Sequence, residues 1–344
     1  MIKSHKFIFL ILTIISLSLL LLNICTGSVS IPISEVFKSL FMGETVSETW
    51  QYIVINYRLP KAIMAILAGI GLSVAGLLMQ TLFRNPLAGP YVLGLSSGSS
   101  LGVAFVVMGA GLLPTFLSEI LLSTYGIIIA SCLGSFVVLT FVLSFSAKLR
   151  DTNSILIIGL MFSGFTSAIV GVLTYFSTAE QLQKFTFWSM GSLGNISYPS
   201  IAMLSIVVLI GLIFAIASLK SLDALLLGEN YAKSLGLNFK KARFIVLLST
   251  SILAGSITAF AGPIAFVGLA VPHMAKIIFK TSNHKILFMA TLFFGAITML
   301  ICDMLCFVPW LDIRLPINAV TSIIGAPIVI WLIVNPYKNR QNIQ

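Results

Sequence analysis

The sequence predicts an all-α integral membrane protein, a polytopic bundle of about ten transmembrane helices. Hydrophobic residues make up 58% of the 344-residue chain and charged residues only 9%, whereas a soluble domain carries about 25% charged residues. The apolar residues gather in runs long enough to cross a bilayer, and most basic residues lie in alternate loops between those runs. No polar stretch is long enough for a separate soluble domain, so residues 1–344 are expected to form a single transmembrane domain.

A membrane-spanning helix needs about 20 apolar residues to cross about 30 Å of hydrocarbon. The first run follows Lys3 and Lys6, as a secretion signal would, but its apolar stretch is long and "NICTGSVS" is a poor cleavage site, so we expect an uncleaved span. The seventh and eighth runs are separated only by Gly262-Pro263. The ten predicted spans are 7–25, 61–82, 91–113, 121–145, 154–176, 201–219, 244–262, 264–280, 286–308 and 317–334.

The distribution of Lys and Arg predicts the orientation, because basic residues are retained on the cytoplasmic side. With the N-terminus inside, fifteen of the twenty basic residues fall on the inner side and five on the outer side, while six of the ten acidic residues fall outside. Both termini are therefore expected to be cytoplasmic. The net charge of +10 reflects this topology and attraction to the inner leaflet, and it is no indication of nucleic-acid binding.

Small residues recur at every fourth position in three predicted spans, and in lipid such stripes let helix backbones approach closely. The stripe of the fifth span has a second interpretation, a translocation path, because Ser163, Thr166 and Ser167 also offer hydroxyl groups. The stripes are Gly94, Gly98 and Gly102 in the third span, Gly126, Ala130 and Gly134 in the fourth, and Gly159, Ser163, Ser167 and Gly171 in the fifth.

The segment "RNPLAGP" (84–90) predicts a tight hairpin on the inner side, between the second and third spans. Asn85-Pro86 ends the second helix, because proline disfavours a helical conformation in the residue before it. Pro90 can begin the next helix, since the first turn does not need its missing N–H.

Four blocks stand out along the chain: "RLPKAIMAILAGIGLSVAGLLMQTLFRNPLAGPYVLGLSSGSSLG" (58–102), "LLLGENYAKSLGLN" (225–238), "AGPIAFVGLAVPHMAKII" (261–278) and "RLPINAVTSIIGAPIVIWLI" (314–333). Together they resemble the FecCD-type permeases, the membrane subunits of bacterial ATP-binding cassette (ABC) importers for ferric siderophores, haem and cobalamin. The resemblance implies a type II importer fold of ten spans in the bacterial inner (cytoplasmic) membrane. The residues that we assign to the family motifs are Gln80, Asn85, Pro86, Gly94, Pro272, His273 and Asp303.

The energy source is expected to be a separate protein, because the chain lacks the GxxxxGK[ST] loop that binds nucleotide phosphates. We therefore expect no cofactor on this chain. The resemblance implies that the inner segment 221–242 couples to the ATPase. Its sequence predicts two short helices broken at Gly228, with a C-terminal cap at Gly236; the alternative is a loop folded back on its own bundle. The candidate coupling residues are Leu225, Gly228, Glu229, Tyr231, Ala232, Leu235 and Gly236.

On the outer side, the resemblance implies basic residues that pair with glutamates on the two lobes of a substrate-loaded binding protein. Arg58 and Lys61 match that motif at the mouth of the second span; the alternative is interfacial snorkelling. Many relatives carry another arginine where this chain has Phe307. Arg314, at a position often acidic in relatives, is a candidate replacement.

Polar residues on the pathway are few. The resemblance implies an inner gate at Asp151, Thr152 and Asn153, which are equally suited to cap the fifth helix. Asp303 lies inside the ninth span, and a membrane-buried carboxylate is a functional candidate by default. We expect it to form a buried pair with an outer basic residue, or to be protonated, rather than to couple ions.

No metal site is expected. The four cysteines lie in apolar runs without CxxC spacing. His273 has no two further ligands nearby in the sequence, so we assign it a structural or interface role.

Two other classes of function compete with an importer. A secondary transporter also uses broken helices, but ion coupling by a single intramembrane carboxylate is not expected. An intramembrane hydrolase is suggested by the GxSxG pattern at 94–98. That motif requires a strand–turn–helix setting, and the three histidines offer no obvious base beside it.

The resemblance thus implies a permease that works by alternating access. Two copies of this chain, or this chain and a close relative, would enclose the passage. Two ABC ATPase subunits would drive it, and an extracytoplasmic binding protein would deliver the cargo. A ferric siderophore is the expected cargo, and haem or cobalamin is the alternative.

Overall fold

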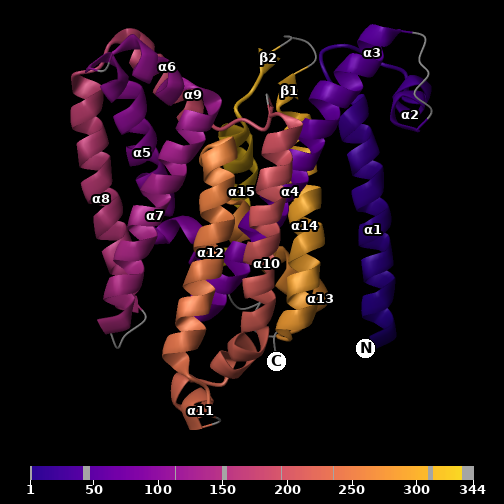
Figure 1. Cartoon of the computed structure of the whole chain (residues 1–344). Helices are drawn as coiled ribbons and strands as arrows, with labels where there is room; N and C mark the ends of the chain where they lie inside the picture. Colours follow the sequence, from indigo (N-terminus) through magenta and orange to yellow (C-terminus); the bar gives the residue numbers. More distant parts are fainter. Residues whose placement is uncertain are drawn as a thin grey trace.

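Helices form nearly all the regular structure in this computed structural model, and the long ones run side by side between two ends (Figure 1). The structure describes residues 2–41, 47–112, 114–148, 153–194, 196–234, 236–308 and 313–334. Within those ranges the only strands are β1 (Phe307–Val308) and β2 (Ile313–Arg314), an antiparallel pair. The predicted all-α fold is confirmed.

Each of the ten predicted spans corresponds to one helix. Within the described ranges, seven helices are long and apolar enough to cross a membrane: α1 (Ile2–Cys25), α4 (Leu59–Leu82), α7 (Thr124–Lys148), α8 (Asn153–Tyr175), α10 (Tyr198–Leu226), α12 (Phe239–Ala261) and α14 (His284–Leu305). The other three predicted spans are shorter apolar helices, α5 (Leu95–Gly109), α13 (Val267–Phe279) and α15 (Ile317–Val334).

The third and eighth spans are shorter than the sequence predicts because the backbone interrupts them. Pro90–Leu93 forms a separate 3-10 turn, η2, and Gly94 follows in a left-handed conformation with φ +79°. Before α13 the chain is irregular as far as Phe266, which has φ +65°. The 13 residues of α13 reach about 20 Å, which is less than the hydrocarbon thickness of about 30 Å.

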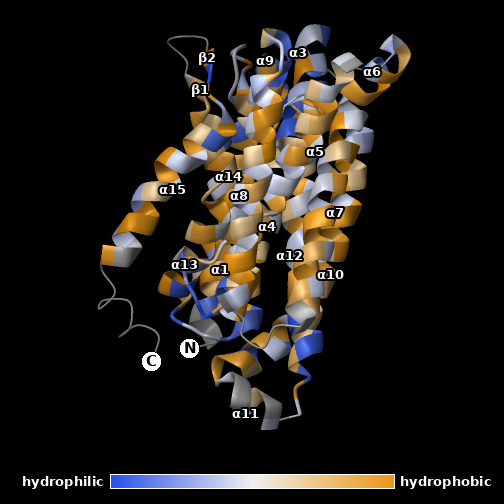
Figure 2. Ribbon diagram, turned by 90° about the vertical axis from the view of Figure 1, so that its left-hand side faces the viewer, coloured by the Kyte–Doolittle hydropathy of each residue, from blue (hydrophilic) through white to orange (hydrophobic). Residues whose placement is uncertain are grey.

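The short elements lie at the two ends of the bundle (Figure 1). We call these the hairpin end, after the β1–β2 hairpin, and the α11 end; the separate hairpin at 84–90 belongs to the α11 end. The hairpin end carries α2 (Ile33–Phe41), α3 (Glu48–Ile53), the π-helix η1 (Val54–Arg58), η3 (Ala110–Leu112), α6 (Thr115–Leu122), α9 (Ala179–Ser189) and the β1–β2 pair. The α11 end carries α11 (Glu229–Ser234), and α1 starts and α15 finishes on that side (Figure 2). Hydrophilic residues gather at the two ends, with apolar residues between them (Figure 2).

Helix α4 lies at the centre of the bundle, where it packs against α10, α12, α13 and α14. Glycines bring its neighbours close: a Cβ built on Gly69 would lie 2.1 Å from the Gly295 carbonyl oxygen, and one on Gly76 would lie 1.7 Å from that of Gly268. Pro272, inside α13, has no N–H to donate to the Gly268 carbonyl. That carbonyl is therefore left facing α4.

Parts of the stripes predicted in the third and fourth spans, Gly98 and Gly102 with Ala130 and Gly134, are confirmed as a packing contact between α5 and α7. The outer members lie elsewhere, because a Cβ on Gly94 would meet Gly159 and Ser163 of α8, and one on Gly126 would meet the end of α6. A Cβ on Gly98 would lie 2.6 Å from the Gly134 carbonyl oxygen, and one on Gly102 would lie 2.1 Å from that of Ala130. The hydroxyl groups of Ser99 and Ser135 hydrogen-bond across the same contact. A larger residue at these positions would force the two helices apart.

Candidate functional site

The segment 221–242 forms the tip of the α11 end. Helix α10 continues as far as Leu226, so the first of the two short helices predicted here is the end of a 29-residue helix. The predicted break at Gly228 is confirmed, with φ +113°, and α11 follows it. Gly236 has φ +83° after α11, as its predicted capping role requires. The side chain of Asn238 then accepts a hydrogen bond from Lys241 N and caps α12.

The apolar side chains of this segment point in two directions. Leu225 is 3% exposed and Ala232 is fully buried, so these two candidates pack into the bundle and offer no surface to a partner. Tyr231 is exposed, and so are Leu226 and Leu227 on the preceding turn. Leu235 and the side chain of Glu229 lie outside the described residues. Leu227 was missed because the sequence pattern does not distinguish the two faces of a helix end.

The predicted hairpin at 84–90 is attached to the end of α10. The guanidinium of Arg84 donates a hydrogen bond to the Leu225 carbonyl oxygen at 2.5 Å. Asn85 stabilises the turn, since its side-chain oxygen accepts a hydrogen bond from Leu87 N at 2.9 Å. Because Arg84 contacts Leu225, a movement of the coupling segment would act directly on the end of α4.

Two of the motif blocks meet beside this hairpin. Gln80 donates from Nε2 to the Leu269 carbonyl oxygen at 3.0 Å, and its Oε1 accepts from Lys276 Nζ at 3.2 Å. His273 lies on the same short helix as Lys276, and both line one cavity with Gln80 and Pro86. The fold thus brings 58–102 and 261–278 together at the α11 end.

At the hairpin end, Asp303 is the centre of an ionic cluster. Its carboxylate is 2% exposed and lies 2.8 Å from Lys61 Nζ and 3.0 Å from Arg314 Nη2. Asn23 of α1 donates to the same carboxylate at 2.7 Å. The expected buried pair with an outer basic residue is confirmed. Asn23 was missed, because nothing in the sequence connects α1 to α14.

The side chain of Arg58 points into the protein. It is 5% exposed, and its guanidinium donates to the carbonyl oxygens of Ile24 at 3.0 Å, of Cys25 at 2.8 Å, and of Val29. It therefore satisfies carbonyl groups left without partners at the end of α1. Lys61 is also largely covered, with 12% of its side chain exposed. In this structure neither side chain is presented at the surface, and their predicted docking role stays a prediction.

Arg314 is placed differently, because half of its side chain is exposed. It lies in β2, where it pairs across the strands with Phe307 of β1. Phe307 and Arg314, the two positions considered for the outer arginine, are therefore cross-strand neighbours. A cavity of about 290 Å³ lies against this cluster, lined by Asp303, Arg314 and the loop at Gly191.

The stripe on α8 divides into a packed half and an open half. A Cβ on Gly159 would lie 2.4 Å from the Val92 carbonyl oxygen, and Ser163 donates to the Gly159 carbonyl oxygen at 2.9 Å. Ser167 is exposed, and among the described residues no atom from outside the local α8 backbone lies within 4 Å of a Cβ on Gly171. The predicted gate residues Asp151 and Thr152 lie outside the described residues, as does the side chain of Asn153, where α8 begins.

The sequence model of the FecCD transport family matches residues 11–335. The chain belongs to the FecCD transport family. Members of this family are permease subunits of ABC transporters, which are transport components and are not themselves catalytic. The GxSxG pattern lies where α5 begins, in a helix, and lacks the strand–turn–helix setting of a hydrolase.

Curated relatives match over nearly their whole length. A putative ABC transporter permease of Methanocaldococcus jannaschii is 36% identical, covering 91% of both chains. The hemin transport system permease HmuU of Yersinia pestis is 33% identical over 94% of this chain and 96% of its own. The vitamin B12 import system permease BtuC of Klebsiella pneumoniae is 31% identical over 96% of this chain and 94% of its own.

Solved structures agree with the fold. An inward-facing conformation of a putative metal-chelate type ABC transporter superposes with a TM-score of 0.78 at 28% identity, covering 96% of this chain and 99% of that one. PsaBC from Streptococcus pneumoniae, in complex with a Fab, has a TM-score of 0.55 at 15% identity, covering 90% of this chain and 98% of that one, and supports the fold alone.

Proposed function

We propose that this permease imports a ferric siderophore across the cytoplasmic membrane by alternating access, with the α11 end in the cytoplasm. The family fixes the class of transporter, and a haem permease and a vitamin B12 permease among the relatives give two alternative cargoes. A metal-chelate type transporter is the structural neighbour with the higher of the two TM-scores. The positive-inside distribution supports the orientation.

The observation that carries the coupling mechanism is the exposed apolar surface at the tip of the α11 end. Leu226 and Leu227 are 46% and 64% exposed, and Tyr231 is 55% exposed. They belong to the end of α10 and to α11, and α11 lies at the lower tip of the bundle (Figure 1). A separate ATPase that covers them would bury apolar area. Its movement would pass through Leu225 and Arg84 to α4.

At the hairpin end, the binding protein docks through Arg314. This side chain is half exposed, so it can meet a carboxylate of a partner without leaving the cluster. Lys61 and Arg58 stabilise this arrangement: Lys61 pairs with Asp303, and Arg58 hydrogen-bonds to the end of α1. Paired charges of this kind speed and orient the encounter more than they raise affinity.

The pathway runs along the open half of α8. Ser167 and Gly171 lie on a face of α8 that the other described residues leave uncovered. A second copy of the chain, or a close relative, would close that face and complete the passage. Two ATPase subunits would then meet the two coupling segments.

The proposal predicts the uptake behaviour of two variants at Gly236. Proline cannot adopt φ +83°, and among the described residues no atom crowds a Cβ on this glycine, so Gly236→Pro distorts the coupling segment and leaves the bundle intact. Gly236→Asn is the matched control, because asparagine tolerates the left-handed conformation. Uptake of a ferric siderophore, haem and cobalamin is measured in a deletion strain that carries the full importer.

We expect ferric siderophore uptake with the wild type and with Gly236→Asn, and its loss with Gly236→Pro at unchanged membrane abundance. Cargo-stimulated ATP hydrolysis should fall in parallel. If only haem or cobalamin were taken up, the proposed cargo would be wrong, but the proposed coupling mechanism would still hold. Normal uptake by Gly236→Pro would remove segment 221–242 from the coupling mechanism.

A further inference from the structure

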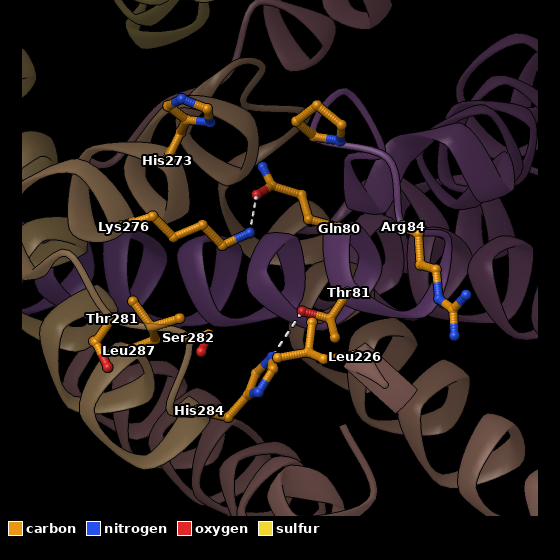
Figure 3. Close-up of a pocket in the computed structure, with 11 residues that line it drawn as sticks. Gln80, Thr81, Arg84, Leu226, His273, Lys276, Thr281, Ser282, His284 and Leu287 are labelled. Atoms are coloured by element: carbon orange, nitrogen blue, oxygen red, sulfur yellow. Dashed lines mark hydrogen bonds between the residues drawn. The ribbon is translucent and has the colours of Figure 1, made fainter. Parts of the chain in front are cut away.

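The cavity at the α11 end has a lining that is rich in positive charge and hydrogen-bond donors. Its volume is about 420 Å³, which is within the range of small-ligand sites. Lys276 and His273 come from α13, Arg84 from the hairpin after α4, and Thr281 and Ser282 from the turn before α14. Figure 3 shows Lys276 and Gln80 pointing toward one another between these groups.

Within the part of the chain that the structure describes, the ammonium of Lys276 forms no ion pair with a carboxylate. Among the described residues its polar contact is with Gln80 Oε1 at 3.2 Å, and no Asp or Glu lies within ion-pair distance. A cation held out of bulk water without a counter-charge is costly. The cavity therefore favours an anion beside Lys276.

Asp223, which contacts the cavity residue His284, already has hydrogen-bond partners of its own. Asp223 accepts a hydrogen bond from His284 Nδ1 at 2.6 Å and another from His284 N at 3.0 Å. His284 is buried and contacts Thr81 on its other ring nitrogen, at 2.9 Å (Figure 3). The negative charge of Asp223 is thus matched by His284 and by a backbone N–H, and Lys276 receives none of it.

The position of the cavity indicates the source of the anion. It lies where α4 and α13 end and α14 begins, so it is at the boundary of the membrane-spanning region. Leu226 and Leu287 add an apolar side to the lining. In a phosphoglycerol group, the phosphate oxygens would contact the cations, and the glycerol carbon atoms would contact this apolar side.

We propose that this cavity is a binding site for a phosphoryl group, supplied by the headgroup of an anionic phospholipid. Basic pockets between helix ends at a membrane surface suit such headgroups. The phosphate oxygens take hydrogen bonds from Lys276 and from the hydroxyl groups of Thr281 and Ser282, and Arg84 adds positive charge at the rim. The bound lipid joins α13 and α14 to the hairpin after α4.

The test compares the full chain in phosphatidylcholine nanodiscs with and without phosphatidylglycerol. Retained phosphatidylglycerol is counted by native mass spectrometry, and the thermal midpoint is recorded. Lys276→Gln removes the charge but can still hydrogen-bond Gln80, and Lys276→Arg keeps the charge. Lys285→Gln is the matched control, because Lys285 is exposed near the same turn and does not line the cavity.

We expect the wild type, Lys276→Arg and Lys285→Gln to retain phosphatidylglycerol and to gain in thermal midpoint. Lys276→Gln should bind it at least about tenfold more weakly, since a charged hydrogen bond to phosphate is lost. Equal retention by Lys276→Gln and the wild type would overturn the proposal. Stabilisation by inorganic phosphate alone, again lost in Lys276→Gln, would support the phosphoryl site and make free phosphate its ligand.

A measurement on the wild type covers the case in which Lys276→Gln does not fold. Inorganic phosphate should displace retained phosphatidylglycerol, because both use the same cations. A wild-type protein that retains no phosphatidylglycerol and is not stabilised by phosphate would refute the site without any variant.

Discussion

At the hairpin end the buried carboxylate of Asp303 is held by two cations and an amide, whereas at the α11 end the ammonium of Lys276 has an amide oxygen as its polar contact. The first cluster is nearly complete within the chain, and only half of the Arg314 side chain is left free. The second is incomplete. The charges at the hairpin end are thus paired within the chain, whereas among the described residues Lys276 has no carboxylate partner, which is the place that the proposed phosphoryl group would take.

The largest expected effect comes from breaking the complete cluster. Asp303→Ala leaves the covered ammonium of Lys61 without its carboxylate, and the loss of one partner of a buried ion pair costs about 3–5 kcal/mol. The free energy of unfolding, measured in mixed micelles, should fall by that amount. Glu180→Ala removes an exposed pair with Lys184 and should cause no measurable change.

A double variant separates charge from packing at this cluster. Lys61→Met combined with Asp303→Leu removes both charges, and replacement of a buried ion pair by apolar residues is often close to neutral. Recovery of most of the lost stability would show that the unpaired charge caused the loss. A double variant as unstable as Asp303→Ala would show that the site depends on shape.

Much of this arrangement is predictable from the sequence where a local rule applies. Apolar run length predicts the ten helices, since the bilayer thickness sets a length for each. An acidic residue inside a span requires a cation or a proton, so a partner for Asp303 was expected. The break at Gly228 and the cap at Gly236 follow from the conformations that glycine allows.

Other features depend on contacts that no local rule supplies. Lys276 and Gln80 are 196 positions apart, and only the crossing of α4 and α13 brings them together. The direction of Arg58 is set by the end of α1 and the segment after it, which present the carbonyl oxygens of Ile24, Cys25 and Val29 to it. The burial of Leu225 depends on how far α10 continues as a helix, and that of Ala232 depends on the contacts of α11 with α10 and α12. The sequence alone indicates none of these.

A smaller loss of stability is expected from a substitution at Arg58. This test distinguishes Arg58, which has a structural role, from Arg314, the proposed docking residue. Arg58→Met removes a charged donor from the carbonyl oxygens of Ile24, Cys25 and Val29, which should cost about 1.5–3 kcal/mol. The free energy of unfolding and the cleavage rate of the α1–α2 connection by a protease report it. Lys184→Met, on the exposed face of α9, is the control.

The alternative outcome at Arg58 has a clear meaning. A variant with normal stability and weakened affinity for the binding protein would show that Arg58 turns outward in the docked state. The docking role predicted from the sequence would then hold for Arg58. Arg314 would then share the docking role with Arg58.

The smallest effect is expected at the α11 end, where Arg84 makes one hydrogen bond from an exposed position. Arg84→Gln removes the guanidinium and places its amide nitrogen two atoms nearer the backbone, so the hydrogen bond to the Leu225 carbonyl oxygen is lost and the free energy of unfolding should fall by only about 0.5–1 kcal/mol. Amide hydrogen exchange in 221–236 should nevertheless increase, because the end of α10 loses its attachment to the hairpin. Lys240→Gln changes the same charge at an exposed position of α12 and should leave that exchange unchanged. Equal exchange in both variants would mean that buried Leu225 and Ala232 alone hold the segment, so that motion of the coupling tip would reach α4 through packing and not through this hydrogen bond.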